Sequence, residues 1–128
     1  MTIEESFQTL CQSVFPDGLK AALVTDKDGV AILKCISPDA PANIAAHAVP
    51  ATFAVVNNQA SKLGLGQNTS IVTMYDLYQV VQLDHNPMII TLVGDAASNT
   101  GRLKVLGRDI MQMTQPLIDT LLRRERQP

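Results

Sequence analysis

Segments typical of β-strands come in two blocks along this chain, and helical patterns separate the blocks. In the first block, residues 19–25 and 30–36 flank a turn at residues 26–29, where Gly29 can take a positive φ. The second block predicts strands at residues 70–75, 77–83 and 87–93, with a weak turn at Asp76 and a strong one at residues 84–87. Strands joined by short turns pair antiparallel, so the blocks predict one antiparallel sheet.

The first helix is predicted from an N-terminal cap. Thr2 can accept a hydrogen bond from the amide of Glu5, and the helix should end before Pro16. Apolar residues follow the cap at helical spacing, namely Ile3, Phe7, Leu10 and Val14.

The second helix is predicted from residue 50 or 51 to residue 65, after an irregular, proline-containing surface loop at residues 37–50. Gly64 and Gly66 supply a helix stop. One sector of the helical wheel holds Phe53, Val56, Ala60 and Leu63, and the roughly opposite sector holds Val55, Asn58 and Lys62.

The last helix should begin near Ser98 or Asn99, either of which can cap it. Its apolar residues repeat in steps of three and four: Leu103, Leu106, Ile110, Met113, Leu117 and Leu121. Pro116 lies inside this pattern, so we expect a kink or a division into two helices.

The order of elements is therefore helix, strand, strand, helix, strand, strand, strand, helix. A length of 128 residues fits a single domain, residues 1–128. Because amphipathic helices need an apolar sheet face to cover, the sequence predicts an α+β sandwich with helices packed on a five-stranded antiparallel sheet.

The charge of the chain argues against a nucleic-acid partner. Ten basic and twelve acidic side chains give a net charge of -2. Residues 101–128 are more basic than the rest but contain no aromatic side chain on which a base could stack. We therefore expect no nucleic acid among the partners.

Catalysis finds little support in the sequence. The two histidines are His47, in the proline-containing loop, and His85, in a turn, and neither has an obvious partner. The loop at residues 94–101 lacks the Lys that ends a phosphate-binding loop. We expect no catalytic residue and no cofactor. The enzyme alternative is a small hydrolase or nucleotide-binding protein that uses Asp84, His85 or this loop.

Metal ligation also lacks a pattern. Cys11 and Cys35 are far apart in sequence, and we interpret both as buried core residues without a disulfide. Asp26 and Asp28 match only part of a calcium loop. The sequence predicts no metal site.

The N-terminus resembles no signal peptide, and no apolar run approaches the roughly 20 residues that span a bilayer. Thr2 occupies the position at which myristoylation needs glycine. We expect a cytosol-facing protein that reaches a membrane only through a partner.

One strand lacks every usual protection against pairing with another chain. Residues 70–75, Ser-Ile-Val-Thr-Met-Tyr, contain no charge, proline or glycine. The residues alone leave two alternatives open: a central strand covered by its neighbours, or an edge strand that a second subunit must cover.

Several short motifs resemble the roadblock family, and within it the MEK-partner scaffold subunits of the Ragulator complex. They are "SKLGL" at residues 61–65, "YQVVQ" at residues 78–82, "SNTG" at residues 98–101 and the turn at residues 26–30. The resemblance extends from about Asp17 to Leu122. It implies a roadblock/longin-like sandwich in which the strand after the second helix is an edge.

This resemblance also implies an interface and partners. The interface would use Thr52, Val55, Gln59 and Lys62 of the second helix and Ser70, Ile71, Val72, Thr73, Met74 and Tyr75 of the edge strand. The expected partners are a second roadblock-family Ragulator subunit, in a heterodimer, and then other Ragulator subunits, Rag GTPases and the kinases MEK and ERK.

The implied role is that of a non-catalytic scaffold on the cytosolic face of late endosomes and lysosomes, supporting MEK–ERK signalling and amino-acid signalling to the TOR complex. A dynein roadblock light chain is the alternative within the same fold.

Overall fold

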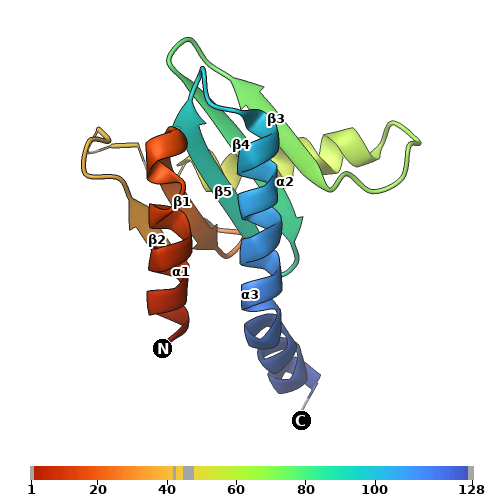
Figure 1. Cartoon of the computed structure of the whole chain (residues 1–128). Helices are drawn as coiled ribbons and strands as arrows, with labels where there is room; N and C mark the ends of the chain where they lie inside the picture. Colours follow the sequence, from red (N-terminus) through yellow and green to blue (C-terminus); the bar gives the residue numbers. More distant parts are fainter. Residues whose placement is uncertain (1, 42, 45–47, 127–128) are drawn as a thin grey trace.

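A computed structural model describes residues 2–41, 43–44 and 48–126. The first half contains helix α1 (Ile3–Gln12), a short 3-10 helix η1 (Phe15–Asp17), strands β1 (Leu19–Thr25) and β2 (Ala31–Ile36) and helix α2 (Ala48–Ser61). Strands β3 (Ser70–Met74), β4 (Tyr78–His85) and β5 (Met88–Asp95) follow, and helix α3 (Thr100–Arg126) ends the chain (Figure 1).

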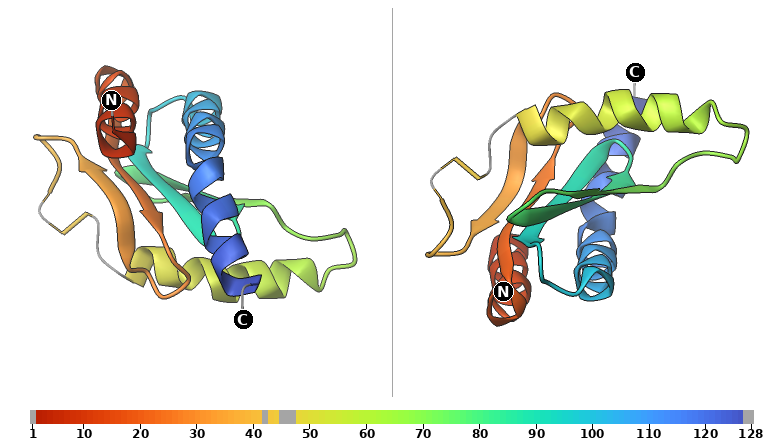
Figure 2. Two further views of the ribbon diagram at one scale, coloured as in Figure 1. Left: turned by 90° about the horizontal axis from the view of Figure 1, so that it is seen from below. Right: turned by 90° about the horizontal axis from the view of Figure 1, so that it is seen from above.

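The five strands form one antiparallel sheet in the order β2-β1-β5-β4-β3. Figure 2 shows this sheet as a layer between α2 on one face and α1 with α3 on the other. The predicted order of elements and the sheet are thus confirmed. The two sequence blocks meet where β1 pairs with β5, which places β3 at one edge and β2 at the other.

Most of the core lies between the sheet and the pair α1 and α3. It is built on Phe7 of α1, on alternate residues of β5 such as Ile90 and Leu92, and on Leu106 and Ile110 of α3, all of which are buried. Burial of each such side chain contributes about 2 kcal/mol. A smaller cluster of Ala21, Val80 and Val93 lies on the opposite face, which α2 shares.

Gly107 allows α3 to approach the sheet closely. A Cβ atom at this position would lie 2.3 Å from Cδ1 of Leu83 in β4. A side chain here would require the Leu83 side chain to move, since interiors are close-packed.

Several local predictions are confirmed. Thr2 accepts from the amide of Glu5 at 3.1 Å, and Asn99 accepts from the amide of Arg102 at 3.1 Å, so both caps form. Asp26 closes the β1–β2 turn by accepting from the amides of Asp28 and Val30. Cys11 and Cys35 are buried, free thiols, as expected.

The predicted bounds of α2 and the expected division of α3 are wrong. α2 begins at Ala48 and ends at Ser61, although Gly64 and Gly66 beyond its end have the positive φ expected of them. α3 is one helix through Pro116, so the expected division into two helices does not occur. Its later residues Leu117, Ile118 and Leu121 pack against the main core, and this packing outweighs the lost amide of Pro116.

The buried side chain of Gln79 ties the β5–α3 loop to β4. Its Nε2 donates to the carbonyl oxygens of Ser98 at 2.7 Å and Asp95 at 3.1 Å, and its Oε1 accepts from the hydroxyl of Thr100 at 2.6 Å. Loop carbonyls and the first side chain of α3 are thereby satisfied without water.

We expect Gln79→Glu to lower the free energy of unfolding by about 3 kcal/mol, because a buried carboxylate would face carbonyl oxygens. Urea unfolding checks this. Gln112→Glu, on the exposed face of α3, should change stability little, and equal effects of the two variants would contradict the assigned role.

His85 is the last residue of β4, not part of the turn, and its ring is buried. Its Nε2 lies 2.9 Å from the hydroxyl oxygen of Thr114, which donates its own hydrogen to the carbonyl of Ile110 at 2.7 Å. Because that hydrogen is used, Nε2 carries the ring proton and donates to Thr114.

His85 should make stability depend on pH. Burial lowers the pKa of His85 from its ordinary value of 6.5, against a smaller opposing effect of Asp84. The stability it contributes is fully present above pH 6.5 and is lost as the pH falls from there toward the folded pKa, because the unfolded chain takes up the proton first. We expect urea unfolding to show a loss of up to about 1.4 kcal/mol per pH unit in this window.

His85→Gln keeps an N–H donor for Thr114 but cannot titrate, so it serves as the control. The slope in this window should disappear in the variant. The same slope in both proteins would assign the pH dependence to other groups.

Candidate partner interface

β3 is an edge strand, which excludes the alternative of a central strand covered by its neighbours. It pairs with β4 on one side, and its other side meets no strand of the described chain. α2 lies across one face of the sheet and contacts both β5 and β3 (Figure 2). The predicted helix and strand of the interface are therefore neighbours in space.

The backbone of β3 alternates between paired and open groups. The amide of Tyr75 donates to the carbonyl of Tyr78 at 2.8 Å, and the amide of Asp84 donates to the carbonyl of Thr69 at 2.9 Å. Both bonds show that the backbone N–H and C=O groups of the odd-numbered residues point toward β4. Since the direction alternates along a strand, the N–H and C=O groups of residues 70, 72 and 74 face the open edge.

The opposite edge, β2, shows what a protected edge looks like. The outward carbonyl of Lys34 accepts from Nε2 of Gln8 at 2.9 Å, and the charged Lys34 side chain lies exposed in the middle of the strand. Both features hinder pairing with a foreign strand. In the described part of the chain, no side chain bonds to the outward groups of β3, and its five residues are uncharged.

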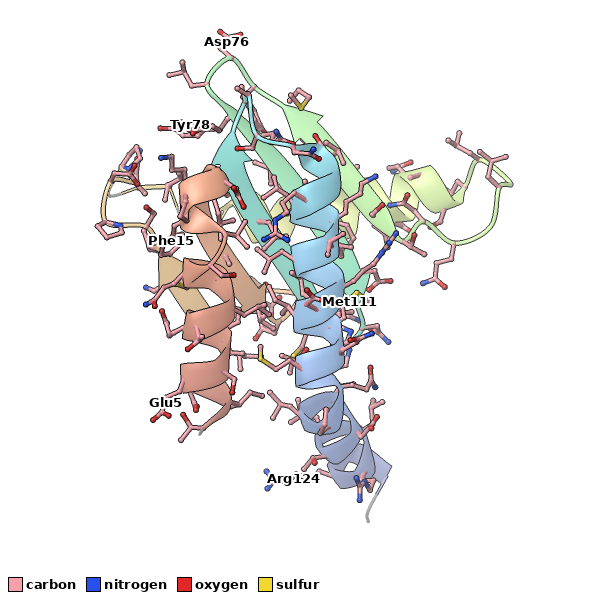
Figure 3. The ribbon with its side chains drawn as sticks, viewed as in Figure 1. Glu5, Phe15, Asp76, Tyr78, Met111 and Arg124 are labelled. Carbon is pink, nitrogen blue, oxygen red and sulfur yellow. The ribbon has the colours of Figure 1, made fainter. Side chains whose placement is uncertain are left out.

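Exposed apolar side chains gather around this edge. The side chain of Val72 is 38% exposed and that of Met74 is 58% exposed. Their cross-strand partners, Val81 and Gln79, point toward the face of the sheet that α3 covers, so Val72 and Met74 lie on that face too. Tyr75 follows β3, and Figure 3 shows the next residue, Asp76, at the tip of the β3–β4 turn. Asp76, the acidic residue nearest to β3 in sequence, thus lies outside the strand and leaves the edge uncharged.

α2 contributes a second group of exposed residues. Val55 is 67% exposed, and Gln59 and Lys62 are exposed as predicted, although Lys62 follows the last helical residue. Thr52 belongs to α2, but its side chain lies outside the described part. We call the outward edge of β3 together with Val55, Val56 and Gln59 the β3–α2 surface.

The helical wheel misplaced two residues and missed others. Val56 and Leu63 fell in the sector of Phe53, yet both are exposed, whereas Phe53 is buried. Leu63 lies beyond the end of α2, and Val56 lies at the border of the packed sector. Leu65, in the loop after α2, and Leu77, between β3 and β4, are further exposed apolar residues that the predicted interface did not include.

The candidate catalytic residues are occupied by structural contacts. His85 is bound to Thr114, and a carboxylate oxygen of Asp84 accepts from the amide of Asn86. The β5–α3 loop is held by Gln79. His47 lies outside the described residues.

The thiols are equally unsuited to chemistry. Burial raises the pKa of Cys11 to about 12, with a further contribution from Cys35, and burial also raises the pKa of Cys35. Both therefore stay protonated and poorly nucleophilic at neutral pH.

Within residues 2–41, 43–44 and 48–126, no group of three or more His, Cys, Asp or Glu side chains is arranged to hold a metal ion. None of the described helices combines the length and apolar character that a membrane span requires.

A family model described as "Mitogen-activated protein kinase kinase 1 interacting" matches residues 1–121. The chain belongs to this family. Ragulator complex protein LAMTOR3 of Pagrus major is 37% identical over 105 residues, which cover 82% of each protein. LAMTOR3 of Homo sapiens is 35% identical over 101 residues, or 79% of this chain and 82% of that protein.

Solved structures of other proteins share the fold of this chain. The gliding protein MglB from Thermus thermophilus superimposes with a TM-score of 0.70 at 14% identity, covering 88% of each chain. A roadblock/LC7 domain from Streptomyces avermitilis gives 0.67 at 12% identity, covering 87% of this chain and 96% of that one. The predicted roadblock fold is confirmed.

The open edge predicts an alternating pattern of amide hydrogen exchange in the isolated chain. The amides of Val72 and Met74, which face outward, should exchange rapidly, while those of Ile71 and Thr73, which are paired with β4, should be protected. NMR-detected exchange measures each amide. Slow exchange at Val72 and Met74 in a monomer would contradict the assigned strand orientation.

Proposed function

We propose that this chain is a non-catalytic scaffold subunit of a Ragulator complex and that it pairs with a second, different roadblock subunit through the β3–α2 surface. The observation that carries the proposal is the difference between the two sheet edges. β2 is protected by Lys34 and Gln8, whereas the five residues of β3 are uncharged and its outward backbone groups are unpaired in the described part of the chain.

Pairing would follow from hydrogen bonding and apolar burial. The outward groups of residues 70, 72 and 74 bond to the matching strand of the partner, and the two sheets become continuous. The exposed side of α2, with Val55 and Gln59, packs against the partner's corresponding helix. Such a junction buries on the order of 1,200–2,000 Å², which suffices for a stable complex.

The wider role rests on the relatives. The similar proteins are named Ragulator complex proteins, and the family description names mitogen-activated protein kinase kinase 1. On this basis we propose binding to other Ragulator subunits, Rag GTPases and the kinases MEK and ERK. The site of action would be the cytosolic face of late endosomes and lysosomes, reached through a partner, with outputs to MEK–ERK and TOR signalling.

Val72→Lys tests the pairing, and Met74→Lys repeats the test two residues along the same face. A charge at the edge opposes strand pairing, so we expect affinity for the co-expressed roadblock partner to fall by at least about 100-fold in a pull-down titration. The matched control is Val30→Lys, because Val30 is 57% exposed and precedes the protected strand β2.

A second variant tests the contribution of the backbone amide of Val72 to pairing. Val72→Pro removes an amide that faces outward and leaves the pairing with β4 in place, so the fold should survive while binding is lost. Wild-type affinity of Val72→Lys and Val72→Pro in folded protein would place the interface elsewhere.

A further inference from the structure

A cavity of about 420 Å³ lies beside α2, at the end of the sheet where β4 turns into β5. Its walls come from α2, from the loop before β3, from the β4–β5 hairpin and from the β1–β2 turn. The lining residues that matter below are Lys27, Phe53, Asn58, Gln67, Asp84 and Asn86.

The cavity and the β3–α2 surface lie on different sides of α2. Asn57 and Ser61, one helical turn apart, line the cavity together with Asn58. Val55, Val56 and Gln59 do not line it. The cavity and the β3–α2 surface therefore share no residue of α2.

The wall on the α2 side is held in place by hydrogen bonds. Nδ2 of Asn68 donates to Oδ1 of Asn57 at 2.9 Å, and the Asn68 amide donates to the hydroxyl of Ser61 at 3.2 Å. These bonds fix the loop that carries Gln67 against the helix. The cavity is therefore preformed, as small binding sites usually are.

Its lining combines an apolar floor with a rim of unused carboxamides. Phe53, Met88 and Ile89 are buried and form the apolar part. The side-chain amides of Asn58, Gln67 and Asn86 make no hydrogen bond within the described part of the chain. Lys27 and Asp84 add one charge of each sign, so the lining has no net charge.

We propose that this cavity binds an extended, uncharged peptide segment of a partner protein, with one apolar side chain of the segment on the floor. A carboxamide presents a donor and an acceptor side by side, which matches the donor and acceptor of a peptide group. The volume lies within the usual range of about 300–1,000 Å³ for specific pockets. The balanced charges of Lys27 and Asp84 give no advantage to an acidic or basic segment.

The probe is a library of random linear peptides displayed on phage and selected against the 128-residue chain. The selected peptides should share one aliphatic or aromatic residue and no charged residue. With a synthetic peptide of that sequence, NMR shifts should appear at the side-chain amides of Asn58 and Gln67. No enrichment, a required charge, or shifts confined to β3 would overturn the proposal.

Matched variants locate the contact. Asn58→Asp and Gln67→Glu keep the side-chain shape but replace the donor, so each should weaken peptide binding by about tenfold. Gln112→Glu, on α3, is the control and should bind as the wild type does. Equal binding by all three variants would overturn the assignment.

Peptide binding in the cavity and subunit pairing at β3 should be independent of each other. Val72→Lys should bind the peptide normally, while Asn58→Asp should pair normally with the roadblock partner. Failure of one proposal is thus distinguishable from failure of the other, and loss of peptide binding in Val72→Lys would contradict a separate cavity.

Discussion

Unpaired backbone groups at the outward edge of β3 are the constraint on which the proposed function depends. A free N–H or C=O group at a sheet edge is readily satisfied by another strand, so an edge strand must be either protected or covered. This chain protects β2 with a charged side chain and a bond from Gln8 to the Lys34 carbonyl. It leaves β3 uncharged, which makes sense if a second subunit covers that edge.

The rest of the fold positions this edge. The pairing of β1 with β5 puts the sheet's most buried strand in the middle and leaves β3 at the outside. α1 and α3 cover one face, and Gly107 lets α3 lie close to β4. α2 covers the other face and separates two surfaces, an apolar one beside β3 and an amide-lined cavity at the hairpin end.

Local features of the fold were predictable from sequence because local chemistry determines them. The caps at Thr2 and Asn99 depend on a side chain and an amide three residues away. Strand β1 has the predicted bounds because turn-forming residues flank it. The position of β3 in the sheet was not predictable from its own residues, because it depends on β1 pairing with a strand distant in sequence; the family resemblance supplied it.

The errors in α2 and α3 also arise because local patterns do not contain the contacts between distant segments. The helical wheel placed Leu63 on the packed side of α2, but Leu63 lies beyond the last helical residue, Ser61; Val56 lies within α2 and is nevertheless exposed. Pro116 should have interrupted α3 on local grounds, but packing of the following turns against the core maintains one helix. The cavity residues come from four separate segments and share no sequence motif, so no local pattern could have indicated that site.

Amide exchange in the complex with a co-expressed roadblock partner tests the central claim most directly. The outward amides of Val72 and Met74 should become protected on complex formation, while the already paired amides of Ile71 and Thr73 change little. Unchanged rapid exchange at Val72 and Met74 in a fully formed complex would contradict the account, since it would show that the partner does not complete the sheet at β3.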